Sequence, residues 1–213
     1  LRSIARLQNR LGGDILLNGH SIDSYAQDEF ARLLSIVLTS RPDAQSMTVY
    51  ELVALGRTPY TGFWGRLSDE DRKIVDHALY MVGMQNMSRR RVCSLSDGEC
   101  QKVMIAKSLA QGTPIILLDE PTAFLDFHGK VELLTLLRRL AHNEGKTILL
   151  STHDLEAALQ TADRLWMLDK DGIHEGEPKL LVANGDVDRY IGQKGVSVDK
   201  DFRIKISVSD NNN

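Results

Sequence analysis

The sequence of 213 residues predicts an α/β fold built on a mostly parallel sheet with helices on both faces. Short continuous apolar runs alternate with stretches whose apolar residues recur at helical spacing. Capping pairs and glycine stops separate these segments. Strands that are apolar on both faces and alternate with helices are typical of parallel sheets.

The first third of the chain predicts short elements. Leu1–Asn9 has near-helical apolar spacing and is interpreted as the end of a helix, and Asp14–Gly19 as a strand closed by an Asn-Gly turn. Ser35–Leu38 is a candidate buried strand. A short helix is expected over Met47–Leu55 from a cap at Ser46 or Thr48, and Arg57–Leu67 is expected to be a loop.

Two longer helices carry clear start signals. Ser68 with Asp71 forms a capping pair before an apolar stripe that runs to Val82. Ser96 with Glu99 forms a second pair, and Gly112 ends the helix that follows.

The rest of the chain alternates strands with helices before its pattern decays beyond Asp186. The expected elements are, in order, the strand Ile115–Leu118, the helix Val131–Leu140, the strand Thr147–Ser151, the helix Leu155–Ala162 and the strand Arg164–Leu168. The polar tail Ser207–Asn213 is expected to be disordered.

Composition excludes several classes of protein. An apolar fraction of 42% is enough for a sizeable core, and the net charge of −3 gives no reason to expect nucleic-acid binding. No apolar stretch approaches the roughly 20 residues that span a bilayer. Two cysteines, Cys93 and Cys100, are too few for a disulfide framework.

Chemistry-capable side chains follow two of the predicted strands. Asp119-Glu120 and Thr152-His153-Asp154 come at strand ends, where ligands bind in open parallel sheets. One carboxylate can hold a divalent cation while its neighbour faces an attacking water, and the imidazole can contact an anionic oxygen. Taken singly, they also fit a solvated strand cap and a satisfied histidine at a helix start.

A third candidate is the segment Leu95–Glu99 directly before a helix. A hydroxyl, a glycine and the free N–H groups of a helix start form a natural anion site. A simple N-cap explains the same residues.

Together, these motifs resemble those of ATP-binding-cassette (ABC) transporter ATPases. Leu95–Glu99 is similar to the LSGGQ signature, Ile115–Thr122 to the Walker B segment, Ala123–Asp126 to the D-loop and His153 to the switch histidine, in the family's order. The resemblance implies a P-loop NTPase-like (RecA-like) parallel-sheet core with an inserted helical subdomain at about 47–111. It places the ATPase domain at 1–171 and a C-terminal extension at 172–213.

The resemblance also implies roles for individual residues. Asp119 would help to hold Mg²⁺, Glu120 would polarise the attacking water, and His153 would contact the γ-phosphate of ATP. Ser96 and Gly98 would bind the γ-phosphate of an ATP held by a second ATPase subunit. Asp126 would pass information across that head-to-tail dimer, in which two ATP molecules are sandwiched.

Three departures from the family pattern are visible. The sequence has no GxxxxGK followed by Ser or Thr, so we expect that the chain was cut just after its Walker A P-loop, without its N-terminal strands, and that it binds ATP poorly and is inactive alone. Thr39 stands where the family has a glutamine that contacts Mg²⁺. Asp97 and Glu99 put acidic charge near a phosphate site, which disfavours phosphate unless they point away or cap the helix.

The segments Val49–Tyr60 and Trp64–Ser68 are similar to the subfamily that imports iron-siderophore complexes, haem and vitamin B12. The same residues also fit a simple surface loop. The importer reading implies transmembrane permease subunits, an indirect partnership with a substrate-binding protein, and a peripheral location on the cytoplasmic face of the bacterial inner membrane. Leu55, Arg57 and Tyr60 are the candidate permease contacts.

Two other functions remain open at this point. One is a non-transport ABC ATPase, although the chain has neither sustained heptads nor a basic patch. The other is a non-catalytic interaction module that only binds partners. In it, Thr39, Asp97 and the absent P-loop would be the result of lost ATPase activity. An intact phosphate-binding loop upstream would discriminate against the second.

Overall fold

The computed structural model describes residues 1–44, 46–62, 65–170, 172–192 and 195–206. Trp64 and the tail Ser207–Asn213 lie outside these residues, so the predictions on them are not tested. The chain divides into two compact units, Leu1–Thr152 and a second that begins at His153. The end of the ATPase domain predicted at residue 171 comes from the family resemblance. This division into units does not test it, so it stays a prediction.

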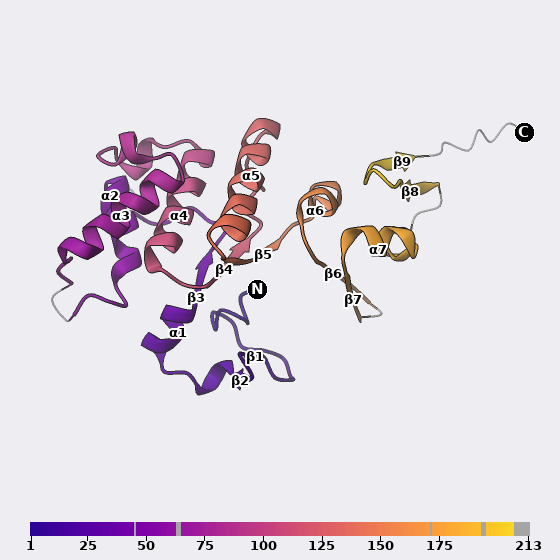
Figure 1. The fold of residues 1–213 in the computed structure, drawn as a ribbon, viewed down its shortest axis with the longest axis horizontal. Coiled ribbons are helices and arrows are strands. Elements are labelled where there is room, and N and C mark those ends of the chain that lie inside the picture. Colours follow the sequence, from indigo (N-terminus) through magenta and orange to yellow (C-terminus); the bar gives the residue numbers. More distant parts are fainter. Residues whose placement is uncertain (45, 63–64, 171, 193–194, 207–213) are drawn as a thin grey trace, which may run out of the picture. The chain divides into compact units, whose positions relative to one another are not determined.

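The first unit contains the predicted parallel sheet (Figure 1). Its strands are β3 (Leu34–Val37), β4 (Ile115–Asp119) and β5 (Thr147–Ser151), in the order β3-β4-β5. Both pairings are parallel, with Val37 opposite Leu118 and Asp119 opposite Ser151. The carboxyl ends of the strands therefore meet at one edge, as expected.

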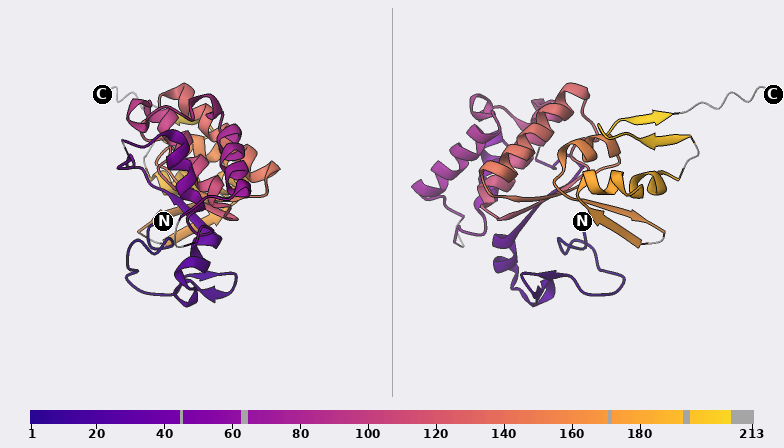
Figure 2. Two further views of the ribbon diagram at one scale, coloured as in Figure 1. Left: turned by 90° about the vertical axis from the view of Figure 1, so that its left-hand side faces the viewer. Right: turned by 45° about the vertical axis from the view of Figure 1, so that its right-hand side comes forward.

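Both faces of this sheet are covered. Ile116 and Leu118 of β4 belong to the core that includes α4 (Asp97–Gln111) and α5 (Phe127–Asn143), whereas Leu117 packs with Phe30 of α1 (Gln27–Leu33). Figure 2 shows α4 and α5 on one side of the strands and α1 on the other. This arrangement confirms the prediction of a sheet covered on both sides.

In the described part of the predicted helical segment, three α-helices each begin at a capping box. α2 (Val49–Ala54) follows Thr48 with Glu51, α3 (Asp69–Met81) follows Ser68 with Asp71, and α4 follows Ser96 with Glu99. In each box both reciprocal hydrogen bonds are present, which satisfies amide groups that a helix start leaves unpaired. Gly112 ends α4 with φ +74°, a conformation that glycine adopts without strain.

The N-terminal residues form one closing turn and a hairpin. The amide of Leu7 donates to the carbonyl of Arg2, and Arg6 has φ +57°, which is the hydrogen-bond pattern that ends a helix. β1 (Leu16–Leu17) pairs antiparallel with β2 (His20–Ser21) across the predicted Asn-Gly turn. The sequence did not predict α1, because its seven residues lack an apolar stripe and a side-chain cap.

The second unit has its own core and sheets. Its elements are α6 (Leu155–Thr161), β6 (Leu165–Asp169), β7 (Gly172–Gly176), α7 (Pro178–Ala183), α8 (Asp186–Ile191), β8 (Val196–Val198) and β9 (Ile204–Ile206). β6 pairs antiparallel with β7, since the short link between them allows only a hairpin. The decay of pattern after Asp186 therefore did not signal a loss of structure, because α8 and the β8–β9 pair lie there.

Short 3₁₀ helices complete the description: η1 (Ile22–Ser24), η2 (Leu55–Arg57), η3 (Gln85–Met87) and η4 (Val92–Ser94). Among the described helices, none combines the length and the apolar character needed to cross a bilayer.

Gly56 of η2 packs directly on the backbone of α4. A Cβ atom there would lie 2.3 Å from the Lys107 carbonyl oxygen and 3.0 Å from the Gln111 amide nitrogen. Gly56→Ala must therefore push two backbone segments apart, and we expect it to lower the free energy of unfolding by about 3 kcal/mol in urea denaturation.

Gly62→Ala is the matched control for this measurement. A Cβ atom at Gly62 would meet no atom of the described residues within 4 Å. Equal losses of stability in the two variants would contradict the packing explanation. They would show a general effect of replacing glycine rather than the contact between Gly56 and the backbone of α4.

Candidate functional site

A hydroxyl group joins the ends of two strands at the sheet edge. Ser151 Oγ donates to Oδ1 of Asp119 at 3.0 Å and accepts the backbone N–H of Glu120 at the same distance. Ser151 was not among the site residues predicted from the sequence. The signal was the parallel register, which sets Ser151 opposite Asp119 at the carboxyl ends of β4 and β5.

Glu120 has an unusual backbone conformation. Its φ of +45° lies in the left-handed region that non-glycine residues rarely adopt. Strained backbone of this kind persists where the surroundings hold it, and here the serine hydroxyl accepts the Glu120 amide hydrogen. The backbone therefore leaves strand geometry at Glu120, directly after Asp119. The two residues are expected to have different roles, Asp119 toward Mg²⁺ and Glu120 toward the attacking water.

Thr39 lies against the same edge. Its hydroxyl donates to the backbone carbonyl of Asp119 at 2.6 Å. Thr39, Asp97 and Glu120 also line a single pocket, with Pro121 and Leu125 among its other residues. Three of the residues singled out from the sequence are thus brought together between β3, β4 and α4.

The helix start at Ser96 serves as an N-cap. Ser96 Oγ accepts the Glu99 amide hydrogen at 3.3 Å, and Glu99 accepts the Ser96 amide hydrogen at 2.8 Å. Glu99 therefore caps the helix, one of the arrangements that sequence analysis left open. A Cβ atom on Gly98 would come no closer than 3.6 Å to Leu125, so packing within the chain does not require glycine there.

Asp97, the second acidic residue of this segment, is paired with a cation. Arg41 donates from both Nε and Nη2 to Oδ1 of Asp97 at 2.9 and 2.6 Å. The negative charge of the Asp97 carboxylate is therefore partly neutralised by Arg41.

The structure does not test the expected roles of Asp126 and His153. Asp126 is the N-cap of α5 and accepts the Gly129 amide hydrogen at 2.8 Å, so its role across a dimer stays a prediction. His153 is the first residue of the second unit and follows β5 by two positions. Its expected contact with a γ-phosphate also stays a prediction.

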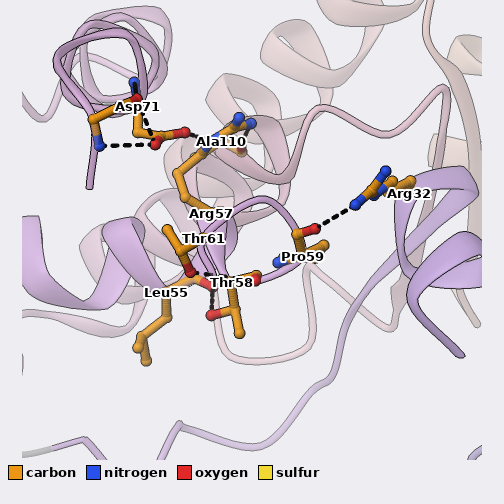
Figure 3. Close-up of polar contacts among 9 residues, drawn as sticks. Arg32, Leu55, Arg57, Thr58, Pro59, Thr61, Asp71 and Ala110 are labelled. Carbon is orange, nitrogen blue, oxygen red and sulfur yellow. Dashed lines mark hydrogen bonds and ion pairs between the residues drawn. The ribbon is translucent and has the colours of Figure 1, made fainter. Parts of the chain in front are cut away.

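Arg57 is not available as a permease contact, contrary to the sequence prediction. Its Nε donates to Oδ1 of Asp71 and its Nη1 to the carbonyl of Ala110, each at 2.8 Å (Figure 3). The guanidinium also lies 3.9 Å from the centroid of the Tyr60 ring, and its side chain is only 9% exposed. Arg57 thus binds η2 to α3 and α4, while Leu55 and Tyr60 remain exposed.

The sheet edge offers oxygen atoms suited to magnesium. The Ser151 hydroxyl contacts the carboxylate of Asp119, the Thr39 hydroxyl contacts the backbone carbonyl of the same residue, and hard cations prefer such oxygen donors. Arg2 Nε, 3.4 Å from Oδ2 of Asp119, is a competing cation at this carboxylate. No group of three His, Cys, Asp or Glu side chains in the described part of the chain could hold a metal. One carboxylate fits a Mg²⁺ that arrives with phosphate oxygens and water.

The family model of ABC transporters matches residues 1–123. Among curated relatives, the chain is 37% identical to the iron(3+)-hydroxamate import ATP-binding protein FhuC of Bacillus subtilis, over 98% of this chain and 77% of that protein. It is 43% identical to the achromobactin transport ATP-binding protein CbrD of Dickeya dadantii, over 78% of this chain and 61% of the relative. It is 31% identical to the cobalamin import ATP-binding protein BtuD of Halobacterium salinarum, over 94% of this chain and 50% of the relative. The chain thus spans less than two thirds of the length of the last two.

Among solved structures, the chain is similar to an ATP-binding cassette described as dimeric, in a post-hydrolysis state bound to ADP and Pi. The TM-score is 0.69 at 26% identity, and the match covers 83% of this chain and 78% of that one.

Proposed function

Since this chain belongs to the ABC transporter family of ATPases, we propose that it is the ATP-binding and ATP-hydrolysing part of an importer for iron chelates. The observation that carries the proposal is the edge of the sheet, where Asp119 and a strained Glu120 share one serine hydroxyl. The chain spans less than two thirds of the length of two of its curated relatives, so the activity is proposed for the whole protein.

In this proposal Glu120 is the general base. A carboxylate beside the phosphate site can accept a proton from the attacking water as it approaches the γ-phosphate of ATP. His153 would donate a hydrogen bond to that phosphate. The hydrogen bond from the Glu120 backbone N–H to Ser151 supports the role, because it fixes the backbone of Glu120 directly after β4.

Asp119 and Thr39 would hold Mg²⁺ at the strand ends. The ion, when bound, would neutralise charge on the β- and γ-phosphates. Thr39 is shorter than the glutamine of the family pattern, and its hydroxyl already donates to the Asp119 carbonyl. It would therefore act through a metal-bound water or through the loop it anchors.

The signature segment would act in a second copy of the chain. Ser96 and Gly98 would bind the γ-phosphate of an ATP held by the partner in a head-to-tail dimer, with Asp126 at the interface. The dimeric state of the similar cassette supports this arrangement. The permease would contact exposed residues such as Leu55 and Tyr60, on the cytoplasmic face of the bacterial inner membrane, and a substrate-binding protein would deliver the cargo.

Iron chelates are the cargo that the comparisons support best. Relatives named for hydroxamate and achromobactin transport are 37% and 43% identical to this chain, against 31% for the cobalamin protein. The cargo does not contact the ATPase in this proposal, so its identity has to be tested by transport.

Transport by cells that lack the gene tests this proposal. Iron-starved mutant cells should lose uptake of radiolabelled ferric hydroxamate, retain uptake of labelled cobalamin, and recover when the gene is restored. Loss of cobalamin uptake alone would overturn the iron assignment, and normal uptake of both would overturn the importer function.

A further inference from the structure

Arg41 forms three hydrogen bonds at the start of α4. Besides its two bonds to Oδ1 of Asp97, its Nη2 donates to the carbonyl oxygen of Leu95 at 3.2 Å. Asp97 and Leu95 flank Ser96, the N-cap of the helix. Arg41 therefore holds the turn into α4 on both sides of its cap.

Folding stability does not explain this contact. The side chains of Arg41 and Asp97 are 51% and 52% exposed, and exposed ion pairs contribute little to stability. Both residues line the pocket that also contains Thr39 and Glu120. The location of the pair at the candidate site is what distinguishes it.

The charges of Arg41 and Asp97 affect how the start of α4 attracts anions. The start of a helix attracts anions, but the carboxylate of Asp97 at its first residue repels them. Arg41 lies on that carboxylate and offsets its charge. An arginine guanidinium is always protonated in proteins, so this cation persists at neutral pH.

The loop that carries Arg41 also contacts the sheet edge. Thr39, two residues before Arg41, donates to the carbonyl of Asp119 at 2.6 Å. One short loop is thus bonded to the end of β4 by Thr39 and to the start of α4 by Arg41. The loop sets the position of the helix start relative to the strand ends.

We propose that Arg41 is a positioning residue for nucleotide: it cancels the charge of Asp97 and holds the start of α4, so that this helix start accepts the terminal phosphate of an ATP held by a second copy. This inference rests on the proposed function. It also explains why the segment tolerates an aspartate in place of the glycine of the family signature.

A double-mutant cycle in the whole protein tests the inference. The variants are Arg41→Ala, Asp97→Asn and the two combined, compared by KM and kcat for MgATP hydrolysis, Kd for MgATP and the melting temperature. Arg41→Ala exposes an uncompensated carboxylate and should raise KM and Kd about tenfold, with kcat nearly unchanged. Asp97→Asn leaves the cation of Arg41 unopposed and should lower KM and Kd, and the double variant should return close to the wild type.

The pattern among the variants decides the outcome. An unchanged KM and Kd in Arg41→Ala, or a defect that persists in the double variant, would overturn charge cancellation. A merely structural contact would impair both single variants alike and lower both melting temperatures. If the wild type binds MgATP but does not hydrolyse it, the proposed function is overturned, while the role of Arg41 can still be judged from the Kd values. If the wild type neither binds nor hydrolyses MgATP, the proposed function and the role of Arg41 are both overturned.

Discussion

Glu120→Gln should lower MgATP turnover by the whole protein at least about a hundredfold while leaving KM nearly unchanged. Glutamine keeps the size and the hydrogen-bonding oxygen of the side chain but cannot accept a proton. The loss should therefore fall on kcat, because nucleotide binding does not need the base. Steady-state phosphate release at saturating MgATP measures the effect.

Glu144→Gln is the control for this prediction, because Glu144 is an exposed residue after α5 and outside the pocket. It should turn over MgATP at the wild-type rate. A Glu120→Gln variant with normal kcat and a raised KM would show that the carboxylate binds substrate rather than activating water.

The sequence predicted the features of this fold that depend on neighbouring residues. Ser68 with Asp71 and Ser96 with Glu99 each form a capping box, since both partners of the box lie within one helical turn. β4 was recognised from a continuous apolar run followed by two carboxylates. The candidate residues of the sheet edge followed from the rule that strand ends meet in parallel sheets.

Features that depend on distant residues were not predicted. Ser151 becomes a partner of Asp119 only through the register of two strands separated by a helix. Arg41 reaches Asp97 across 56 positions of sequence. The burial of Arg57 depends on where α3 and α4 pack, and an arginine in a loop otherwise favours exposure.

Arg57→Glu should destabilise the protein by about 4 kcal/mol, measured by urea denaturation. The substitution leaves the buried carboxylate of Asp71 without its cation, adds a second negative charge beside it, and removes the donor to the Ala110 carbonyl. Arg66→Glu, at an exposed loop position, should change stability by about 0.5 kcal/mol or less.

The pH dependence of the Arg57→Glu penalty separates lost charge pairing from lost packing. Hydrogen bonds from the side chain and the backbone of Ser68, with a further one from Arg57, lower the pKa of Asp71 to about 2. A lowered pKa contributes stability that is fully present above about pH 4 and is lost as the pH falls toward 2. In the variant, acid protonates the two neighbouring carboxyl groups and relieves their repulsion. The difference in stability from the wild type should therefore shrink over this range, whereas a penalty that is constant with pH would assign the effect to packing.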